Sequence, residues 1–452
     1  MTPDDTGRDM DMADDVKDPP TGRRRALATA LAPLRLPAFR VLWAGQAVSA
    51  AGNGMTQIAL VFAVLHVGGS VTDIGLVIAA QTGARVVLTL AGGVWADRLP
   101  RQMLMLTSDL IRAAVQIVLA VLLLIGQAHV WQLGLGAAVF GAAQAFFGPA
   151  SSGLLPEIVP KEQLQRGNAL MSFSDSVCSV LSPALAGLAI MLVGPGLVLA
   201  LDAVTFLVSA ATLARLRLAP RTVAAPASFW ADLRTGWHEL AIRPWLWLNL
   251  SAHTMWNLAI AAYYVLGPAV AQESLGGASA WGIISAGWAA GTVVGGIAAL
   301  RVEPGRPLIA GNLALLFTAL PLLALAGPAP LWVIVAGAFV SGVALLFLDS
   351  MWNASLQQLI PDAVLSRVNS YDWMVSTVAA PIGLALVGPL ADRTGDTSAL
   401  VTAAVMIIVP CSLTVLVPGI RAVRRTPDGR IVGPSLPEAV RPQPETAGVP
   451  RG

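Results

Sequence analysis

The stretch Gly92-Gly93-Val94-Trp95-Ala96-Asp97-Arg98-Leu99-Pro100-Arg101 places a charged turn between two long apolar runs. A reduced copy that has lost the acid, Gly295-Gly296-Ile297-Ala298-Ala299-Leu300-Arg301, follows 203 positions later in the same setting. A second echo keeps nearly this offset, because residues 160–168 (Pro, Leu, Arg and Asn) match residues 361–369 at a distance of 201. The two matches indicate an internal duplication, and a period of about 200 residues fits six membrane spans with their connections.

The composition is that of a chain whose surface faces lipid. Hydrophobic residues make up 56% and charged residues 12% of the 452 residues, whereas about 25% is usual for charged residues in soluble domains. Runs of span length lie at about 39–65, 73–95, 102–125, 130–155, 168–193, 196–215, 245–270, 278–300, 307–326, 331–353, 372–391 and 399–420. Because they lack strand alternation, we expect an all-α membrane protein with twelve transmembrane helices, arranged as two pseudo-symmetric six-helix bundles.

The distribution of Lys and Arg predicts the orientation. With both termini inside, 25 of the 28 basic residues fall in cytoplasmic segments, Arg85 and Arg112 lie within spans, and only Arg393 lies outside. This bias predicts a multi-pass protein of the inner (plasma) membrane with both termini cytoplasmic. The predicted segments are a disordered tail (1–38), a bundle (39–216), a linker with an amphipathic surface helix (217–243), a second bundle (244–421) and a disordered tail (422–452).

Several classes of function lack support in the sequence. There is no phosphate-binding GxxxxGK[ST] loop and no His or Cys cluster with metal-ligand spacing. Cys178 and Cys411 lie inside apolar runs, which disfavours a disulfide framework, and no cleavable signal peptide is apparent. We therefore expect no enzyme, no cofactor, no metal and no nucleic-acid partner, and a monomer whose partners are the lipid bilayer, a small-molecule substrate and protons.

Gly93-x-x-x-Asp97-Arg98-x-x-Arg101 resembles the loop signature of the major facilitator superfamily, and the plan of residues 39–420 resembles its architecture. Four stretches, GNGMTQIAL (52–60), DAVTFLVSA (202–210), DLRTGWHEL (232–240) and RVNSYD (367–372), resemble the branch of bacterial siderophore and macrolide exporters.

The resemblance implies that Gly92, Gly93, Asp97, Arg98 and Arg101 form a gating loop. It also implies that Asp97 meets the start of span 11, near residues 370–372, and stabilises the outward-facing state. Pro100 replaces the usual glycine and Gln102 the second basic residue, which puts the strength of this gate in doubt.

Ionisable residues inside spans are costly and therefore functional candidates. Arg85 is expected near the bilayer centre, twelve residues before Asp97, or about 18 Å along a helix. Asp175 and Asp349 are the expected proton carriers. For Asp109, Arg112 and Asp372, nearer the cytoplasmic interface, salt bridges or caps are expected, and Asp202 is expected to cap or pair near the outer end of span 6.

Polar and aromatic residues within the spans are candidates for a cavity that binds an amphipathic ligand: Asn53, Gln57, Gln81, Gln144, His253, Asn257, Tyr263 and Trp288. Each of them could instead form an interhelical hydrogen bond. Asn53 stands where relatives of the branch often have aspartate, and an asparagine cannot titrate, so we do not expect span 1 to carry the proton.

Two further motifs have competing interpretations. Residues 182–187 (SPALAG) resemble a reduced antiporter signature, but they also fit a proline kink packed through small residues. Gly388-x-x-x-Asp392-Arg393 mimics the gating loop, yet the predicted topology places it outside, where we interpret it as a helix end and a loop rather than a gate.

The leading hypothesis is a proton-coupled exporter of a small amphipathic molecule (a drug, antibiotic or siderophore) that works by alternating access. One alternative is an importer, either a symporter or a facilitator, with Arg85 as an anion contact. Another is a non-transporting membrane sensor or scaffold, which the intact gating pair Asp97 and Arg98 disfavours.

Overall fold

A computed structural model describes residues 31–216, 237, 240–327 and 329–434 of the chain; the side chains of residues 90–98, 362, 363, 366, 367 and 370 lie outside the described part. The first half contains η1 (Ala32–Arg35), α2 (Pro37–His66), α3 (Val71–Arg98), α4 (Arg101–Leu124), α5 (Val130–Ile158), η2 (Lys161–Gln163) and α6 (Leu164–Arg215). The second half contains α8 (Pro244–Val270), a π-helical turn η3 (Ala271–Leu275), α9 (Ala278–Ala299), α10 (Pro307–Leu315), η4 (Leu316–Thr318), α11 (Ala319–Ala326), α12 (Leu331–Leu359), α13 (Asp362–Thr394), α14 (Asp396–Thr414) and α15 (Pro418–Ala422), followed by strands β1 (Arg424–Arg425) and β2 (Ile431–Val432).

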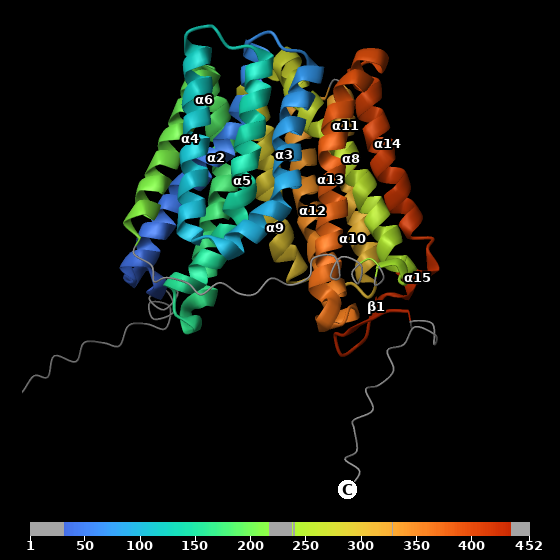
Figure 1. Cartoon of the computed structure of the whole chain (residues 1–452). Coiled ribbons are helices and arrows are strands. Elements are labelled where there is room, and N and C mark those ends of the chain that lie inside the picture. The colour runs from blue at the N-terminus through green and yellow to red at the C-terminus, as the bar shows by residue number, and fades with distance from the viewer. Residues whose placement is uncertain (1–30, 217–236, 238–239, 328, 435–452) are drawn as a thin grey trace, which may run out of the picture.

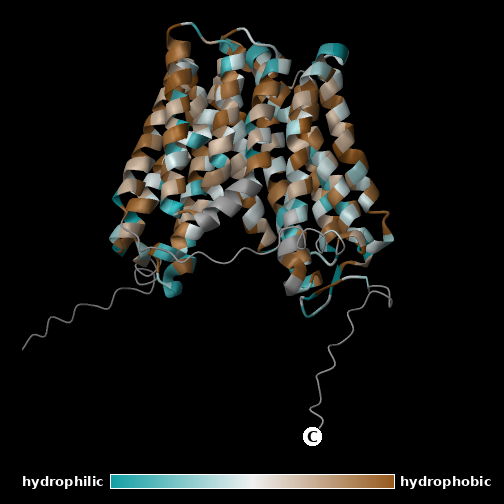
Figure 2. Ribbon diagram, in the orientation of Figure 1, coloured by the Kyte–Doolittle hydropathy of each residue, from teal (hydrophilic) through white to brown (hydrophobic). Residues whose placement is uncertain are grey.

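Eleven helical segments of the described chain are long and apolar enough to cross a membrane. The longest, Lys161–Arg215, joins two helices across a kink at Gly194, where φ is 78°. A straight helix of its 55 residues would measure about 82 Å, far more than the roughly 30 Å of a hydrocarbon core. Counting it as two spans gives the twelve that the sequence predicts, and apolar residues cover the helices while polar residues gather toward their ends (Figure 2).

The helices form a bundle with two end faces (Figure 1). We call the end where α2 begins and α3 ends the lower face, and the end where α2 ends and α3 begins the upper face. The two halves meet along two helix pairs, α6 with α9 and α3 with α13. Toward the lower face, the end of α3 leads away from α13 (Figure 1).

Within each half, small residues allow close helix packing. A Cβ on Gly141 of α5 would lie 2.0 Å from the Gln81 carbonyl oxygen of α3, and one on Gly291 of α9 would lie 2.0 Å from that of Phe339 in α12. Side chains would force each pair apart, since without a hydrophobic driving force membrane helices associate through such close packing. These two contacts occupy equivalent pairs in the two halves.

The expectation of an unstructured chain from residue 422 onward is wrong for residues 422–432. Gly429, with φ at 84°, turns the chain so that β1 pairs with β2. The Ile431 amide donates to Gln358 Oε1 over 2.7 Å, and Ile431 and Val423 are buried against the lower end of the second half. A turn-forming glycine flanked by isolated apolar residues thus anchors the start of the tail.

Two further boundaries differ from expectation. The ordered chain includes η1 and starts α2 at Pro37, so residues 32–38 do not belong to a disordered tail. The predicted surface helix of the linker falls mostly on residues 217–236, 238 and 239, outside the described residues. Trp237, within this stretch, packs against Tyr371 with 6.0 Å between the ring centroids and the rings tilted by 51°.

Candidate functional site

A central cavity of about 150 Å³ lies between the two halves. The first half contributes Gln57 from α2, Ile78 from α3 and Pro183 from α6; the second contributes aromatic rings from α8 and α9. Tyr263 packs against Trp288 and Trp281, with ring centroids 5.1 Å and 4.9 Å apart. The lining is apolar and aromatic with few polar groups, the composition of sites that bind small molecules.

One polar group in this lining has no partner. The Tyr263 hydroxyl is buried and has no hydrogen-bond partner among the described residues. A buried, unpaired hydroxyl costs free energy that a ligand acceptor or a water would recover. Gln57, across the cavity, is exposed and has no hydrogen bond within the described chain that would hold its amide back from a ligand.

A second, polar cavity of about 220 Å³ lies inside the first half and shares Gln57 and Ile78 with the central one. Its remaining lining is formed by Asn53, Thr56, Gln81, Thr82, Arg85 and Gln144. The structure thus brings five predicted residues together here, Arg85 and four amides. No acidic residue lines this cavity among the described residues, so Arg85 sets its charge.

A third cavity of about 490 Å³ lies within the second half. It brings His253 and Asn257 of α8 beside Asp349 of α12 and Asp372 of α13. Asp372 accepts a hydrogen bond from Trp352 Nε1 over 3.0 Å. His253 is less available than predicted, because its Nε2 lies 3.1 Å from Asn249 Nδ2 and its ring packs edge-on against Trp352.

Asp175 of α6 reaches none of the three cavities, yet it is turned away from lipid. It lies on the same helix face as Ser182 and Ala186, which are buried. Phe173 and Val177 belong to the opposite, exposed apolar face. The Asp175 side chain is therefore exposed on the inward face of α6, in the lower part of the helix.

The upper ends of the two halves are in close contact. Thr72 Oγ1 of α3 donates to Asp392 Oδ2 of α13 over 2.7 Å. A Cβ on Gly388 would lie 2.3 Å from the Thr72 Cα, and one on Gly75 would lie 2.3 Å from the Leu384 carbonyl oxygen. The motif Gly388-x-x-x-Asp392-Arg393, interpreted from sequence as a helix end and loop, is indeed a helix end, but it joins the two halves.

The second contact between the halves uses the small residues of the SPALAG stretch. A Cβ on Gly187 of α6 would lie 2.3 Å from the Ala278 carbonyl oxygen at the start of α9. A Cβ on Gly282 would lie 2.5 Å from the Pro183 carbonyl oxygen and 3.1 Å from the Gly187 Cα. Backbone therefore meets backbone here, which favours the packing interpretation of the stretch.

Comparison with known proteins shows to which family the chain belongs. The family model for transmembrane secretion effectors matches residues 28–446. The chain belongs to this family of major facilitator superfamily transporters. Macrolide efflux protein A of Streptococcus pyogenes is 25% identical over 364 residues, covering 79% of this chain and 90% of the relative. The multidrug efflux pump Tap of Mycolicibacterium fortuitum is 27% identical over 393 residues, covering 80% and 90%.

Solved structures agree on the fold of the transporter. The nucleoside transporter NupG matches with a TM-score of 0.68 at 12% identity, covering 84% of this chain and 98% of its own. A bacterial homologue of the iron transporter ferroportin, in an inward-facing state, matches with a TM-score of 0.68 at 17% identity, covering 84% and 98%. The family and fold expected from the gating-loop signature are confirmed, and the protein is a membrane transporter rather than an enzyme.

The loop predicted to act as a gate is only partly described. The side chains of Gly92, Gly93, Asp97 and Arg98, at the lower end of α3, lie outside the described residues. Arg101 begins α4 and donates to Glu157 Oε1 over 3.1 Å and to the Gly153 carbonyl oxygen, both near the end of α5. Arg101 therefore ties α4 to α5 within the first half.

Gln102, which replaces a basic residue of the family signature, also has a structural role. Its Nε2 donates to the carbonyl oxygens of Leu213 over 2.7 Å and Leu216 over 2.8 Å. Leu213 lies in the last turn of α6 and Leu216 directly follows the helix, where carbonyl oxygens lack the amide donors of a further helical turn. A neutral donor is sufficient for this capping contact.

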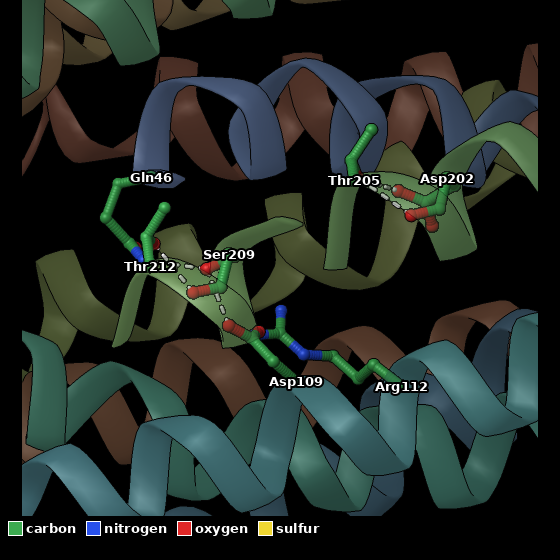
Figure 3. Close-up of polar contacts among 7 residues, drawn as sticks. All are labelled: Gln46, Asp109, Arg112, Asp202, Thr205, Ser209 and Thr212. Atoms are coloured by element: carbon green, nitrogen blue, oxygen red, sulfur yellow. Dashed lines mark hydrogen bonds and ion pairs between the residues drawn. The ribbon is translucent and has the colours of Figure 1, made fainter. Parts of the chain in front are cut away.

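The transporter also contains three charged residues that are buried inside the first half. Asp109, Arg112 and Asp202 are 0%, 3% and 1% exposed, between α2, α4 and α6. The salt bridge expected for Asp109 and Arg112 is present, whereas Asp202, which was expected to cap or pair, has no ion-pair partner among the described residues. Arg112 forms an ion pair with Asp109, and Ser209 Oγ donates to Asp109 over 2.6 Å (Figure 3).

Arg112 is enclosed on its other sides by rings. Its guanidinium lies 4.3 Å from the Phe147 ring centroid and 4.4 Å from that of Phe206. Such cation–π contacts stabilise a desolvated guanidinium. The spacing of Asp109 and Arg112, three residues apart on one helix, was the available signal for this pair.

Asp202 occupies a separate environment of neutral donors. It accepts hydrogen bonds from Thr56 Oγ1, from Gln116 Nε2 over 2.8 Å and from Thr205 Oγ1 over 3.2 Å. Thr56 and Gln116 were missed by sequence reasoning, because a lone threonine or glutamine in a span has no distinguishing pattern.

Proposed function

We propose that the transporter exports a small amphipathic molecule from the cytoplasm in exchange for protons, in the plasma membrane and with both termini cytoplasmic. Family membership provides the transport function. The efflux direction is supported by the names of relatives, which include macrolide and multidrug efflux proteins. The amphipathic character of the substrate follows from the central cavity.

The observation that carries this proposal is a cavity lined by both halves. Aromatic rings of Tyr263, Trp281 and Trp288 face Gln57 and Ile78 across it. A ligand bound there contacts both bundles at once, so its binding free energy depends on how they are arranged. This is the requirement for rocking two bundles around one midplane site.

The contacts between the halves suggest which side is open. The Thr72–Asp392 hydrogen bond and the Gly187–Ala278 contact join the upper ends, while α3 leads away from α13 at the lower face (Figure 1). The excess of Lys and Arg in lower-face connections supports a cytoplasmic lower face. On this assignment the conformation is inward-open, and the Asp97 loop acts in the opposite, outward-facing state.

The predicted proton carriers Asp175 and Asp349 are both exposed in this conformation. Asp175 lies on the inward face of α6 and Asp349 in the cavity of the second half. Both carboxylates would thus be in contact with water from the lower side, where they could exchange protons or bind a cationic group. They remain predictions for coupling.

Everted membrane vesicles test the proposed direction and coupling. Respiration acidifies their interior, so an exporter should accumulate a radiolabelled macrolide inside, and a protonophore should abolish the accumulation. Vesicles without the protein give the background. Accumulation that the protonophore does not reduce would contradict proton coupling. Gradient-driven accumulation only in right-side-out vesicles would show that transport runs into the cell instead of out of it.

Arg85 supports one alternative, import of an anionic solute. It is the charged residue of the polar cavity, where three glutamines surround it as hydrogen-bonding partners for a bound anion. An Arg85→Gln variant that loses binding of an anionic solute, in a protein that fails the everted-vesicle test, would favour this alternative.

A further inference from the structure

We propose that Asp202 is the carboxylate that carries the transported proton and that the Thr56 hydroxyl connects it to the polar cavity; this rests on the proton-driven transport proposed above. Both residues lie in the first half, on α6 and α2. The assignment differs from the sequence-based candidates Asp175 and Asp349. Three observations support the assignment: Asp202 is buried, its hydrogen-bond donors are neutral, and one hydrogen bond links it to a residue that lines the polar cavity.

Asp202 has no ion-pair partner among the described residues. Its direct donors Thr56, Gln116 and Thr205 are neutral. The helices packed around it bring two charged groups near, Arg112 and Asp109 of α4, and these pair with each other. The part of α2 that faces it contributes only uncharged groups.

The pairing of Arg112 with Asp109 matters for the charge balance. These two charges cancel, so an ionised Asp202 adds one uncompensated negative charge to the interior of the first half. An unpaired intramembrane charge is costly, and uptake of one proton removes it. By contrast, the exposed Asp175 and Asp349 can be solvated by water while charged.

The local geometry satisfies both protonation states of Asp202. When Asp202 is ionised, Thr56 Oγ1 donates to Asp202 Oδ2. When Asp202 is protonated, its hydroxyl can donate to Thr56 Oγ1, and the Thr56 hydrogen can turn to the Gly52 carbonyl oxygen at 3.4 Å. Gln116 Nε2 contacts both oxygens, over 3.0 Å and 2.8 Å. No donor or acceptor is orphaned by the exchange.

Thr56 also connects Asp202 to the polar cavity, because Thr56 lines this cavity beside Asn53 and Gln57. As the Thr56 hydroxyl proton moves to Asp202 Oδ2, a protonated water in the cavity gives its extra proton to Thr56 Oγ1 and is left as a neutral water. The cavity loses one proton, the Asp202 carboxylate gains one, and Thr56 ends as the same neutral hydroxyl. The reverse sequence unloads the site.

Gly52 makes this arrangement possible. A Cβ there would lie 2.3 Å from Asp202 Oδ1 and 2.2 Å from Thr205 Oγ1. A side chain would therefore displace the carboxylate from Thr56. Protonation also changes the charge one hydrogen bond away from the cavity lining by one unit, which links proton binding to the charge that a ligand meets.

Infrared titration of the purified protein in lipid nanodiscs tests the assignment without knowledge of the substrate. A protonated carboxyl group has its own C=O stretching band, and we expect the wild type to show one that titrates with pH. Asp202→Asn should remove this band, whereas the matched variants Asp175→Asn and Asp349→Asn should keep it. A band that persists in Asp202→Asn, a band lost in either matched variant, or no titrating band in the wild type would overturn the proposal.

Thr56 variants provide a second readout that does not need Asp202→Asn to fold. Thr56→Val removes the hydroxyl, so the band should shift in frequency and appear more slowly after a pH jump, and Thr56→Ser should restore both. An unchanged band in Thr56→Val would overturn the role of Thr56. Failure of gradient-driven macrolide uptake in the same protein would contradict the proposed function while leaving a titrating Asp202 in place.

Discussion

The Thr72 hydroxyl donates a 2.7 Å hydrogen bond to the Asp392 carboxylate, joining the first turn of α3 to the last turns of α13. The acid belongs to a Gly-x-x-x-Asp-Arg motif, the same pattern that ends α3 at the other face. In each case the end of one of these helices carries the motif, and the start of its partner helix lies at the same face. The protein therefore has the elements of one latch per face, and the upper one is closed.

Weakening the upper latch should shift the protein toward the upper-open state. Asp392 is exposed and Thr72 is partly exposed, so the hydrogen bond contributes about 1 kcal/mol, or roughly fivefold in population. After replacement of Cys178 and Cys411, a cysteine at Gln57 reports access to the central cavity. Thr72→Val removes the donor while keeping the shape of the side chain, and it should raise the labelling rate from the upper side several-fold.

Thr394→Val is the matched control for this experiment. Thr394 lies on the last turn of α13, and within the described part of the chain its hydroxyl donates only to the Leu390 carbonyl oxygen of its own helix, over 2.9 Å. Equal labelling in Thr72→Val and Thr394→Val would show that the contact between the halves does not act as a latch.

The Asp109–Arg112 pair should dominate the stability of the first half. Arg112→Gln leaves the Asp109 charge buried and unpaired, which costs about 3–5 kcal/mol. The double variant Asp109→Asn/Arg112→Gln removes both charges and should recover much of that loss. Thermal unfolding in detergent measures both effects.

An exposed pair provides the comparison. Arg101 and Glu157 keep 17% and 28% of their side-chain surface exposed, so Arg101→Gln should cost about 1 kcal/mol or less. If Arg101→Gln and Arg112→Gln destabilised the protein equally, burial of the Asp109–Arg112 pair would not have the importance argued above.

The close approach of α6 and α9 predicts a strong effect of one methyl group. Gly187→Ala would place a Cβ 2.3 Å from the Ala278 carbonyl oxygen, and overpacking of this kind costs about 1–3 kcal/mol. Transport should fall and upper-side labelling at Gln57 should rise. Gly148→Ala is the control, since nothing lies within 4 Å of a Cβ there; identical behaviour of the two variants would refute the contact.

The unpaired Tyr263 hydroxyl predicts opposite effects on stability and binding. Tyr263→Phe removes a buried group that lacks a partner in the described chain, so the unfolding temperature should stay equal or rise. Binding of a transported macrolide, measured by equilibrium dialysis, should weaken by about tenfold if its acceptor uses this hydroxyl. Lower stability with unchanged binding would mean that the hydroxyl serves the fold.

The sequence predicted the spans because a backbone in lipid has few alternatives to the helix. It predicted the family from the loop around Asp97. It also identified residues that line a cavity, because glutamines such as Gln57, Gln81 and Gln144 are unusual inside spans. It did not identify the partners of Asp202, however, because distance along a span estimates depth but not which neighbours a side chain meets. The partners Thr56 and Gln116 come from two other helices, and only their packing brings them together.

The upper latch was missed for a related reason. Gly388 and Asp392 had the right spacing, but topology placed them outside, and the gate of the family was sought only on the cytoplasmic side. The partner Thr72 lies 320 residues away, in the first turn of α3, where the neighbouring Asp73 bonds locally to Ser70 and does not mark a contact with α13. Pairing between halves is a tertiary property that one sequence does not encode locally.

Alternating access around the central cavity is the central claim, and distances across the two faces test it most directly. Spin labels at Gln127 and Ser398 span the upper face, and labels at Lys161 and Arg301 span the lower face, all at exposed positions. Double electron–electron resonance in nanodiscs should show that a change of pH or added macrolide widens one pair while it narrows the other. Two pairs that stay fixed, or that widen together, would contradict the account.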